Sequence, residues 1–201
     1  MPGKRRIESV FLNLPYDAAF ENQYLAYIVG LTQLGLSINA ALAAPNQGRL
    51  GTIIDLIEKS DFSIHDLSRI EVSRGVPRLH ACRVRSRSLS VAHHHGQHRV
   101  FIFERKQYRA QRSTSDVNGI DPQIHNGTVK RLMGGLRNIF RQPKDVTTVP
   151  EMLASYRAVK QRIPEMRRNA GSKSLFEAAI FQDLKLASLV ESQKLIGRRR
   201  K

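Results

Sequence analysis

Two short stretches of the chain carry side chains that could do chemistry together. The stretch NLPYD (residues 13–17) offers an amide, a phenol and a carboxylate around a proline-stiffened turn. The stretch HDLSR (residues 65–69) offers a carboxylate and a hydroxyl, which could hydrogen-bond a ribose, and a guanidinium, which could hold a phosphate through paired contacts. We therefore predict a ligand site lined by Asn13, Tyr16, Asp17, Asp66, Ser68 and Arg69, with Asp66 as the candidate catalytic residue.

Structural roles for the same residues remain open. Asp17 precedes a predicted helix and could serve only as its N-cap. Asp66 and Arg69 could pair with each other while His65 fills the edge of the core. The sequence holds neither G-x-G-x-x-G nor G-x-x-x-x-G-K-[ST], which excludes an ordinary Rossmann dehydrogenase site and a P-loop.

Apolar runs typical of strands alternate with helical patterns along most of the chain. Strands are expected at residues 9–15, 36–42, 62–68, 99–104 and 120–124, and helices at 18–34, 50–59, 129–140, 151–168 and 174–195. This alternation predicts an α/β fold with a doubly wound parallel sheet of about five strands, covered on both faces, and a C-terminal helical pair. In such sheets ligands bind beyond the carboxyl ends of the strands, where the strand order reverses, and both polar stretches follow strands.

The same patterns suggest how the chain divides. We expect a nucleotide-recognising domain at residues 7–142, a helical appendage at 149–196, and basic tails at 1–6 and 197–201. The single cysteine excludes a disulfide framework. There is no secretory signal and no apolar run of membrane-spanning length, so a cytoplasmic protein without a membrane partner is expected.

The charge balance is strongly basic. The chain has 33 Lys and Arg against 17 Asp and Glu, for a formal net charge of +16. Such a chain attracts polyanions non-specifically. No zinc-finger, KH or RRM signature accompanies the charge, and no arginine-rich helix is interleaved with stacking aromatics. The composition therefore does not by itself predict specific recognition of nucleic acid.

The stretch LHACRVRSRSLSVAHHHGQH (residues 79–98) differs from the chain around it. It holds Cys82, arginines at every second position from 83 to 87, and a histidine run at 93–95. Three adjacent histidines cannot all face one ion from a regular helix or strand, and zinc sites space their ligands. We therefore predict no metal site here.

Four longer stretches resemble a group of uncharacterised bacterial proteins. They are residues 10–36, 53–71, 75–78 and 99–127, and the group's motifs are VFINCPFD, IHDLSR, PRFNMPFELG and LSDLAGxDIxxH. The matching residues are Phe11, Asn13, Pro15 and Asp17; Ile64, His65, Asp66, Ser68 and Arg69; Pro77 and Arg78; and Ser115, Asp116, Gly119, Asp121 and His125. Leu14 and Tyr16 depart from the first motif.

This group is distantly similar to the TIR and nucleoside 2-deoxyribosyltransferase superfamily. The resemblance implies a flavodoxin-like fold and enzymes that cleave N-glycosidic bonds, with NAD or a nucleoside as substrate and no separate cofactor. An active member would be a nucleosidase, an NAD glycohydrolase or a deoxyribosyltransferase-like enzyme. Bacterial TIR-type proteins often serve phage defence, which adds a homo-oligomer or a defence-system partner to the expectations.

The match fails after Arg78, where NMPFELG should open a helix and supply the catalytic Glu. The residues from 79 onward can be assigned plausible codons. When these codons are translated in a reading frame shifted by one base, they give Phe-Met-Pro-Val-Glu-Phe-Gly-Leu-Ala, which is close to the family motif. We hypothesise that residues 79–98 are frame-shifted, so the chain lacks the expected Glu and its activity is in doubt. The alternatives are a non-enzymatic basic module that binds nucleic acid or a signalling nucleotide through residues 129–141 and the tails, and a partner-dependent structural subunit that docks through residues 151–195.

Overall fold

The computed structural model describes residues 7–43, 49–68, 72–73, 76–77, 98–107, 121–140 and 147–199. Its centre is a five-stranded sheet of β1 (Ser9–Asn13), β2 (Ser37–Ala40), β3 (Phe62–Asp66), β6 (Arg99–Glu104) and β7 (Gln123–Ile124). The strand order is β2-β1-β3-β6-β7 and every neighbouring pair is parallel. Numbered by position in the chain, this is the 2-1-3-4-5 order of flavodoxin-like folds. The predicted α/β class and doubly wound sheet are confirmed.

Both faces of the sheet are covered by helices. The 3-10 helix η1 (Ala18–Phe20) leads into α1 (Glu21–Gln33), and η2 (Ala41–Ala43) precedes α2 (Arg49–Glu58). Along β1 the side chains alternate between faces. Leu12 belongs to the core cluster shared with α1 and α4 (Val129–Ile139), whereas Phe11 packs with Ile53 and Ile57 of α2.

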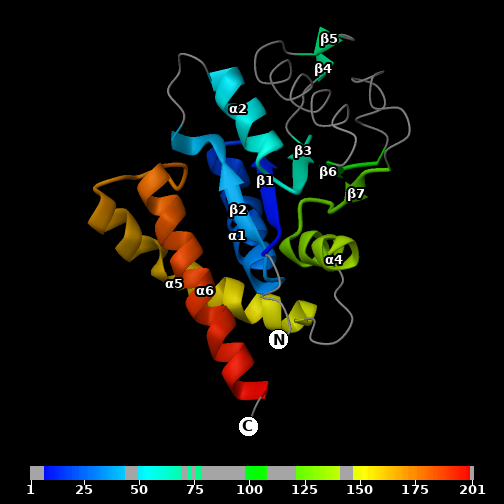
Figure 1. Cartoon of the computed structure of the whole chain (residues 1–201). Helices are drawn as coiled ribbons and strands as arrows, with labels where there is room; N and C mark the ends of the chain where they lie inside the picture. Colours follow the sequence, from blue (N-terminus) through cyan, green and yellow to red (C-terminus); the bar gives the residue numbers. More distant parts are fainter. Residues whose placement is uncertain are drawn as a thin grey trace.

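The helix α1 is buried on all sides, because the C-terminal pair covers its outer surface. The two helices of that pair, α5 (Val149–Ala170) and α6 (Ala178–Arg199), pack against each other and against α1 (Figure 1). All ten residues from Tyr24 to Gln33 are buried as a result. A Cβ at Gly30 would lie 2.8 Å from Cδ1 of Leu136 and 3.2 Å from Cε of Met152, so α1, α4 and α5 approach closely there. The sheet and the C-terminal helices therefore share one core.

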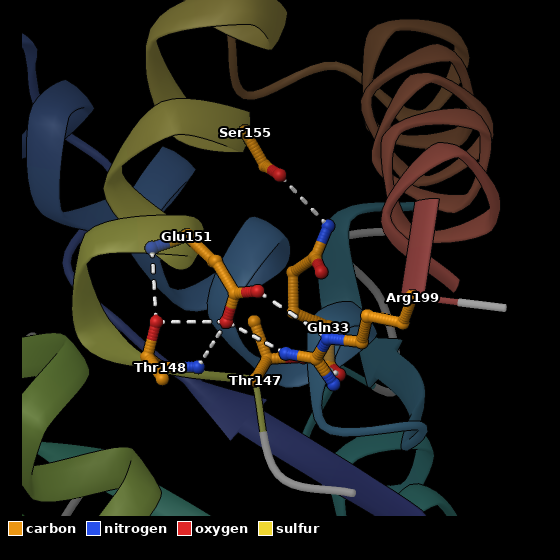
Figure 2. A network of polar contacts seen from close by, with 6 residues as sticks. All are labelled: Gln33, Thr147, Thr148, Glu151, Ser155 and Arg199. Carbon is orange, nitrogen blue, oxygen red and sulfur yellow. Dashed lines mark hydrogen bonds and ion pairs between the residues drawn. The ribbon is translucent and has the colours of Figure 1, made fainter. Parts of the chain in front are cut away.

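A polar network ties the C-terminal pair to the end of α1 (Figure 2). Gln33 donates to Oγ of Ser155 over 3.1 Å, and the Gln33 carbonyl accepts from Thr147 over 3.3 Å. Glu151 accepts from the backbone N–H of Thr148 over 2.7 Å, while Oγ1 of Thr148 accepts from the backbone N–H of Glu151, which completes a capping box. Arg199 at the end of α6 reaches the same Glu151 carboxylate, with 2.6 Å between Nη2 and Oε2. The start of α5 and the end of α6 are thus joined through one side chain.

Substituting Glu151→Gln should lower the free energy of unfolding by about 1 kcal/mol near neutral pH, since it weakens the capping box and removes the ion pair. Burial alone would raise the pKa of Glu151, but the hydrogen bonds from Thr148 and the Arg199 charge outweigh it and lower the pKa. A carboxyl whose pKa is lowered by folding stabilises the fold above its ordinary pKa, and this contribution fades as the pH falls through the lowered value. Urea unfolding across the acid range should therefore show the two proteins converging below the ordinary value of 4.5. A difference that persists unchanged in acid would contradict this assignment.

Local hydrogen bonds explain where helix boundaries differ from the predicted ones. The capping box and Pro150 start α5 at Val149 rather than at residue 151. The backbone N–H of Ser174 bonds to the hydroxyl of Ser172, and that of Phe176 to the hydroxyl of Ser174, over 3.0 and 3.1 Å. These bonds favour turns over helix, so α6 starts at Ala178 rather than at residue 174.

Strand boundaries differ as well. The second predicted strand ends at Ala40, where η2 begins, and the fifth is shortened to Gln123–Ile124. A small antiparallel pair that the sequence did not predict joins β4 (Val72–Ser73) to β5 (Val76–Pro77). The predicted end of the first long helix is confirmed: Gly35 has a φ of 80°, and the N–H of Leu36 bonds back to the carbonyl of Leu31.

Candidate functional site

Buried polar side chains gather at the carboxyl edge of the sheet. Three strands end in them: β1 at Asn13, β3 at His65 and Asp66, and β6 at Glu104; Ser68 and His125 follow β3 and β7. All six are at most 9 % exposed. After β1 the chain adds β2 on one side of it and then β3 and β6 on the other side. The ends of β1 and β3 are therefore the topological switch point of the sheet. Polar groups are costly to bury unless they are hydrogen-bonded, so their concentration at this edge needs an explanation.

The Asp66 carboxylate is fully buried and accepts several hydrogen bonds. Its Oδ2 accepts from the Tyr27 hydroxyl over 2.7 Å, and its Oδ1 accepts from the backbone N–H of Ser68 over 2.9 Å. Nε2 of His125 lies 3.2 Å from Oδ2. Asp66 thus joins the end of β3 to α1 and to the segment after β7.

The tautomer of His125 follows from its neighbours. Nδ1 of His125 accepts the backbone N–H of Gly127 over 3.0 Å, so the ring proton is assigned to Nε2. Nε2 faces both Asp66 and the Ser68 hydroxyl, whose Oγ is 2.9 Å away. In a nucleophilic triad the serine and the carboxylate contact opposite nitrogens of the histidine. Because both contact the same nitrogen here, these three residues form a positioning network rather than a serine-nucleophile triad.

A second polar group lies on the other face of the same edge. Nδ2 of Asn13 is 3.0 Å from Nδ1 of His65, and Nε2 of His65 is 3.0 Å from Oγ of Ser63. The amide donates to Nδ1, which places the ring proton on Nε2 and makes the imidazole neutral. Successive residues of a strand point to opposite faces. Asn13 therefore lies on the α2 side of the sheet, with Phe11, and Asp66 lies on the α1 side, with Ile64.

The remaining members of the first predicted stretch follow β1 directly. Tyr16 is half-buried, with its ring centroid 6.2 Å from that of Tyr24 and 5.7 Å from that of Phe176. Asp17 is also half-buried, and its backbone carbonyl accepts from the N–H of Phe20 over 2.8 Å. Asp17 is the N-cap residue of η1, as considered, but its side chain makes no capping hydrogen bond. His65, in contrast, is fully buried, as the structural interpretation of the second stretch required.

Several predicted features fall outside the described residues. These are Arg69, the segment 79–97 with Cys82 and the histidine run, and the motif residues Arg78, Ser115, Asp116 and Gly119. Within the part of the chain that the structure describes, no group of three or more His, Cys, Asp or Glu side chains could hold a metal ion. Among the same residues, no helix is both long enough and apolar enough to cross a membrane.

The structure adds four residues to the edge that the predicted site did not include: Tyr27, His65, Glu104 and His125. Tyr27 belongs to a buried helix, and its apolar neighbours give no sign that its hydroxyl meets a carboxylate. Glu104 ends an otherwise apolar strand, a position that could have been flagged from the sequence. His125 was named only as a motif match, and its partner Ser68 lies 57 residues away in the chain.

Two tyrosines on α1 provide a matched test of this network. Burial first, and then the nearby Asp66 carboxylate and the hydrogen bond to it, raise the pKa of Tyr27 well above its ordinary value, so it remains a neutral donor. Tyr24 is equally buried, but its hydroxyl has no hydrogen-bond partner among the described residues. Tyr27→Phe should lower the free energy of unfolding by about 1–3 kcal/mol, whereas Tyr24→Phe should leave it unchanged or raise it by up to about 1 kcal/mol. Chemical denaturation of both variants measures the difference, and equal losses would contradict the network.

No protein-family profile matches the chain, and no curated protein shows significant similarity to it. The resemblance of the motifs to the TIR and deoxyribosyltransferase superfamily therefore stays a prediction.

Proposed function

We propose that the chain is a nucleotide-recognising domain that binds NAD or a nucleoside at the carboxyl edge between β1 and β3. The observation that carries this proposal is the coincidence of the topological switch point with the buried polar side chains Asn13, His65, Asp66 and Ser68. Ligands of open parallel sheets bind at that point. The sequence motifs that suggested the superfamily fall on the same strand ends.

The geometry separates the residues proposed to contact a ligand from those that position them. Asp66 is enclosed by Tyr27, Ser68 and His125, so we assign it a positioning role rather than direct contact with a ribose. Tyr16 and Asp17 are half-buried on the segment that follows β1, which makes them the better candidates for direct contact. Ser68 belongs to the positioning set, because its backbone N–H bonds to Asp66 and its hydroxyl contacts His125.

The proposed family chemistry is hydrolysis or transfer at an N-glycosidic bond. This reaction passes through an oxocarbenium-like state that a carboxylate near the sugar stabilises. The Glu that would supply this carboxylate is missing from residues 79–98 as written. Asp17 is a half-buried carboxylate that follows the end of β1 in the chain, and β1 borders the switch point. We therefore propose that this chain binds the ligand but cleaves it weakly or not at all.

Titration calorimetry with NAD and a set of nucleosides tests the binding proposal, and chromatography of the incubated ligands tests cleavage. We expect saturable binding that Asp17→Asn weakens about tenfold or more through a lost charged hydrogen bond, with little product formed. The exposed aspartate variant Asp55→Asn on α2 is the control and should bind normally. No saturable binding of any of these compounds would overturn the proposal.

Sequencing the gene across codons 75–100 decides the catalytic question. If the DNA restores a Met-Pro-x-Glu-x-Gly stretch, the corrected protein should release base or nicotinamide, and replacing that Glu with Gln should abolish the release. If the DNA encodes residues 79–98 as written, the cleavage proposal for this chain is withdrawn and binding alone remains.

The basic module is the second candidate, favoured by the charge of the chain and by α4. Lys130 and Arg131 are exposed at the start of α4, and no acidic residue lies within the helix. A polyanion affinity that falls steeply with salt and persists after both tails are trimmed would support it.

A further inference from the structure

One helix carries nearly all of the large apolar side chains that the described residues expose. Four of the five such side chains lie on α6: Leu186, Leu189, Val190 and Ile196, exposed by 61, 47, 41 and 48 %. The opposite side of α6 is anchored, since Ile180, Phe181 and Leu184 are buried in the shared core. The exposed apolar side chains therefore belong to a fixed surface of the fold.

Six exposed residues of α6 follow the spacing of a coiled-coil seam, and the exposed Val190 lies beside them. They are Ala179, Gln182, Leu186, Leu189, Gln193 and Ile196, which succeed one another at intervals of three, four, three, four and three residues. Alternating intervals of three and four keep side chains along one line of a helix that packs against a second helix. We call these six residues the α6 seam.

We propose that a second copy of this chain covers the α6 seam in an antiparallel, two-fold symmetric dimer. A two-fold axis near residues 187 and 188 places Leu186 against Leu189 of the second copy at the centre. The same axis places Gln182 against Gln193 of the second copy, where the side-chain amides can hydrogen-bond each other. It also places Ala179 against Ile196, so that a small side chain faces a large one. Each of these pairs occurs twice, as a two-fold interface requires.

Charge complementarity favours this arrangement over a parallel one. Asp183 and Lys194 lie on the same flank of the seam by helical spacing, and Lys194 also bonds to Glu191 of its own chain over 2.7 Å. The antiparallel axis brings Asp183 of each copy beside Lys194 of the other, whereas a parallel pair would place like residues at the same level. Two opposite-charge contacts per dimer also offset part of the repulsion between chains of net charge +16.

The composition of the seam argues against the two other occupants considered, a membrane surface and an acidic protein. The side-chain amides of Gln182 and Gln193, which lie next to the central leucines, would lose their hydrogen bonds in a lipid interior. Asp183 lies on the flank of the seam and would be repelled by an anionic lipid surface or by an acidic partner. A second copy satisfies the amides and places a lysine beside Asp183.

Analytical ultracentrifugation of the full-length protein, freed of nucleic acid, tests the dimer. We expect the mass to rise with concentration from 22.8 kDa toward twice that value. Leu189→Lys should raise the dimer dissociation constant about a hundredfold or more, because it places two lysines at the centre of the apolar seam. Ile7→Lys is the matched control, since Ile7 is the fifth exposed large apolar side chain among the described residues and is not part of α6; it should leave the dimer intact.

Charge reversal tests the direction of the helices. Asp183→Lys and Lys194→Asp should each weaken the dimer, and the double variant should restore it, because the two positions then meet again with exchanged signs. A mass of one chain at every concentration, or a dimer that Leu189→Lys leaves unchanged, would overturn the proposal. A dimer lost in Leu189→Lys but not restored by the double charge reversal would overturn the antiparallel pairing.

Discussion

Asp66→Ala is expected to lower the free energy of unfolding by about 3–5 kcal/mol, a large share of the stability of a domain of this size. The carboxylate is fully buried and receives the Tyr27 hydroxyl, the Ser68 amide and Nε2 of His125. Removing it leaves the Tyr27 hydroxyl and the Ser68 amide buried without this acceptor, and each such group costs about 1–3 kcal/mol. Urea unfolding followed by circular dichroism measures the loss.

Two further variants make this result specific. Asp66→Asn keeps the shape but directs amide hydrogens toward existing donors, so it should cost about 1–3 kcal/mol. Asp55→Ala removes an exposed carboxylate from α2 and should change stability by less than about 0.5 kcal/mol. A stable Asp66→Ala protein that has lost only ligand binding would contradict the positioning role and indicate direct contact with the ligand.

The chain ending at residue 146 is expected to show no cooperative unfolding transition. The part removed contributes ten core side chains: Met152, Tyr156, Val159, Ile163, Met166, Leu175, Ile180, Phe181, Leu184 and Ala187. Burying a large apolar side chain stabilises a fold by about 1.5–3 kcal/mol, so the sum exceeds the net stability of about 5–15 kcal/mol typical of a domain. The outer surface of α1 would also be exposed to water. Differential scanning calorimetry of the truncated chain checks this expectation.

Adding the missing helices as a separate fragment distinguishes lost packing from other causes. A peptide of residues 147–201 mixed with the truncated chain should restore a cooperative transition, because Lys185 and Arg167 of the peptide can again bond to the Ile38 carbonyl and to Glu21 of the truncated chain. A truncated chain that unfolds cooperatively by itself would instead show that residues 7–142 form an independent domain, as the sequence patterns suggested.

The sequence predicted the architecture well because the patterns that encode it are local. Apolar runs such as RVFIFE and the stop at Gly35 depend on neighbouring residues, and both occur where expected. The short β7 and the late start of α6 were missed in detail, since serine hydroxyl bonds and pairing with β6 decide them. The burial of α1 on all sides depends on helices more than 120 residues away in the chain, as the contact between Gln33 and Ser155 illustrates.

The candidate site was only partly accessible to sequence reasoning. Asn13, Asp66 and Ser68 do lie at the strand ends where a parallel sheet would place them. The pattern could not show that Asn13 and Asp66 point to opposite faces or that Tyr27 and His125 close around the carboxylate, because these contacts join distant segments. Asp66 was expected to face the ligand, and because Tyr27, Ser68 and His125 enclose its carboxylate we propose a supporting role for it instead.

The most direct test of the proposed function is an NMR titration of the isotopically labelled full-length protein with NAD. We expect saturable shifts of the backbone amides at the carboxyl edge, with those of Asn13, Tyr16, Asp17 and Ser68 among the largest. Shifts confined to Lys130, Arg131 and the rest of α4 that vanish with added salt, or no saturable shift at all, would contradict a ligand site between β1 and β3.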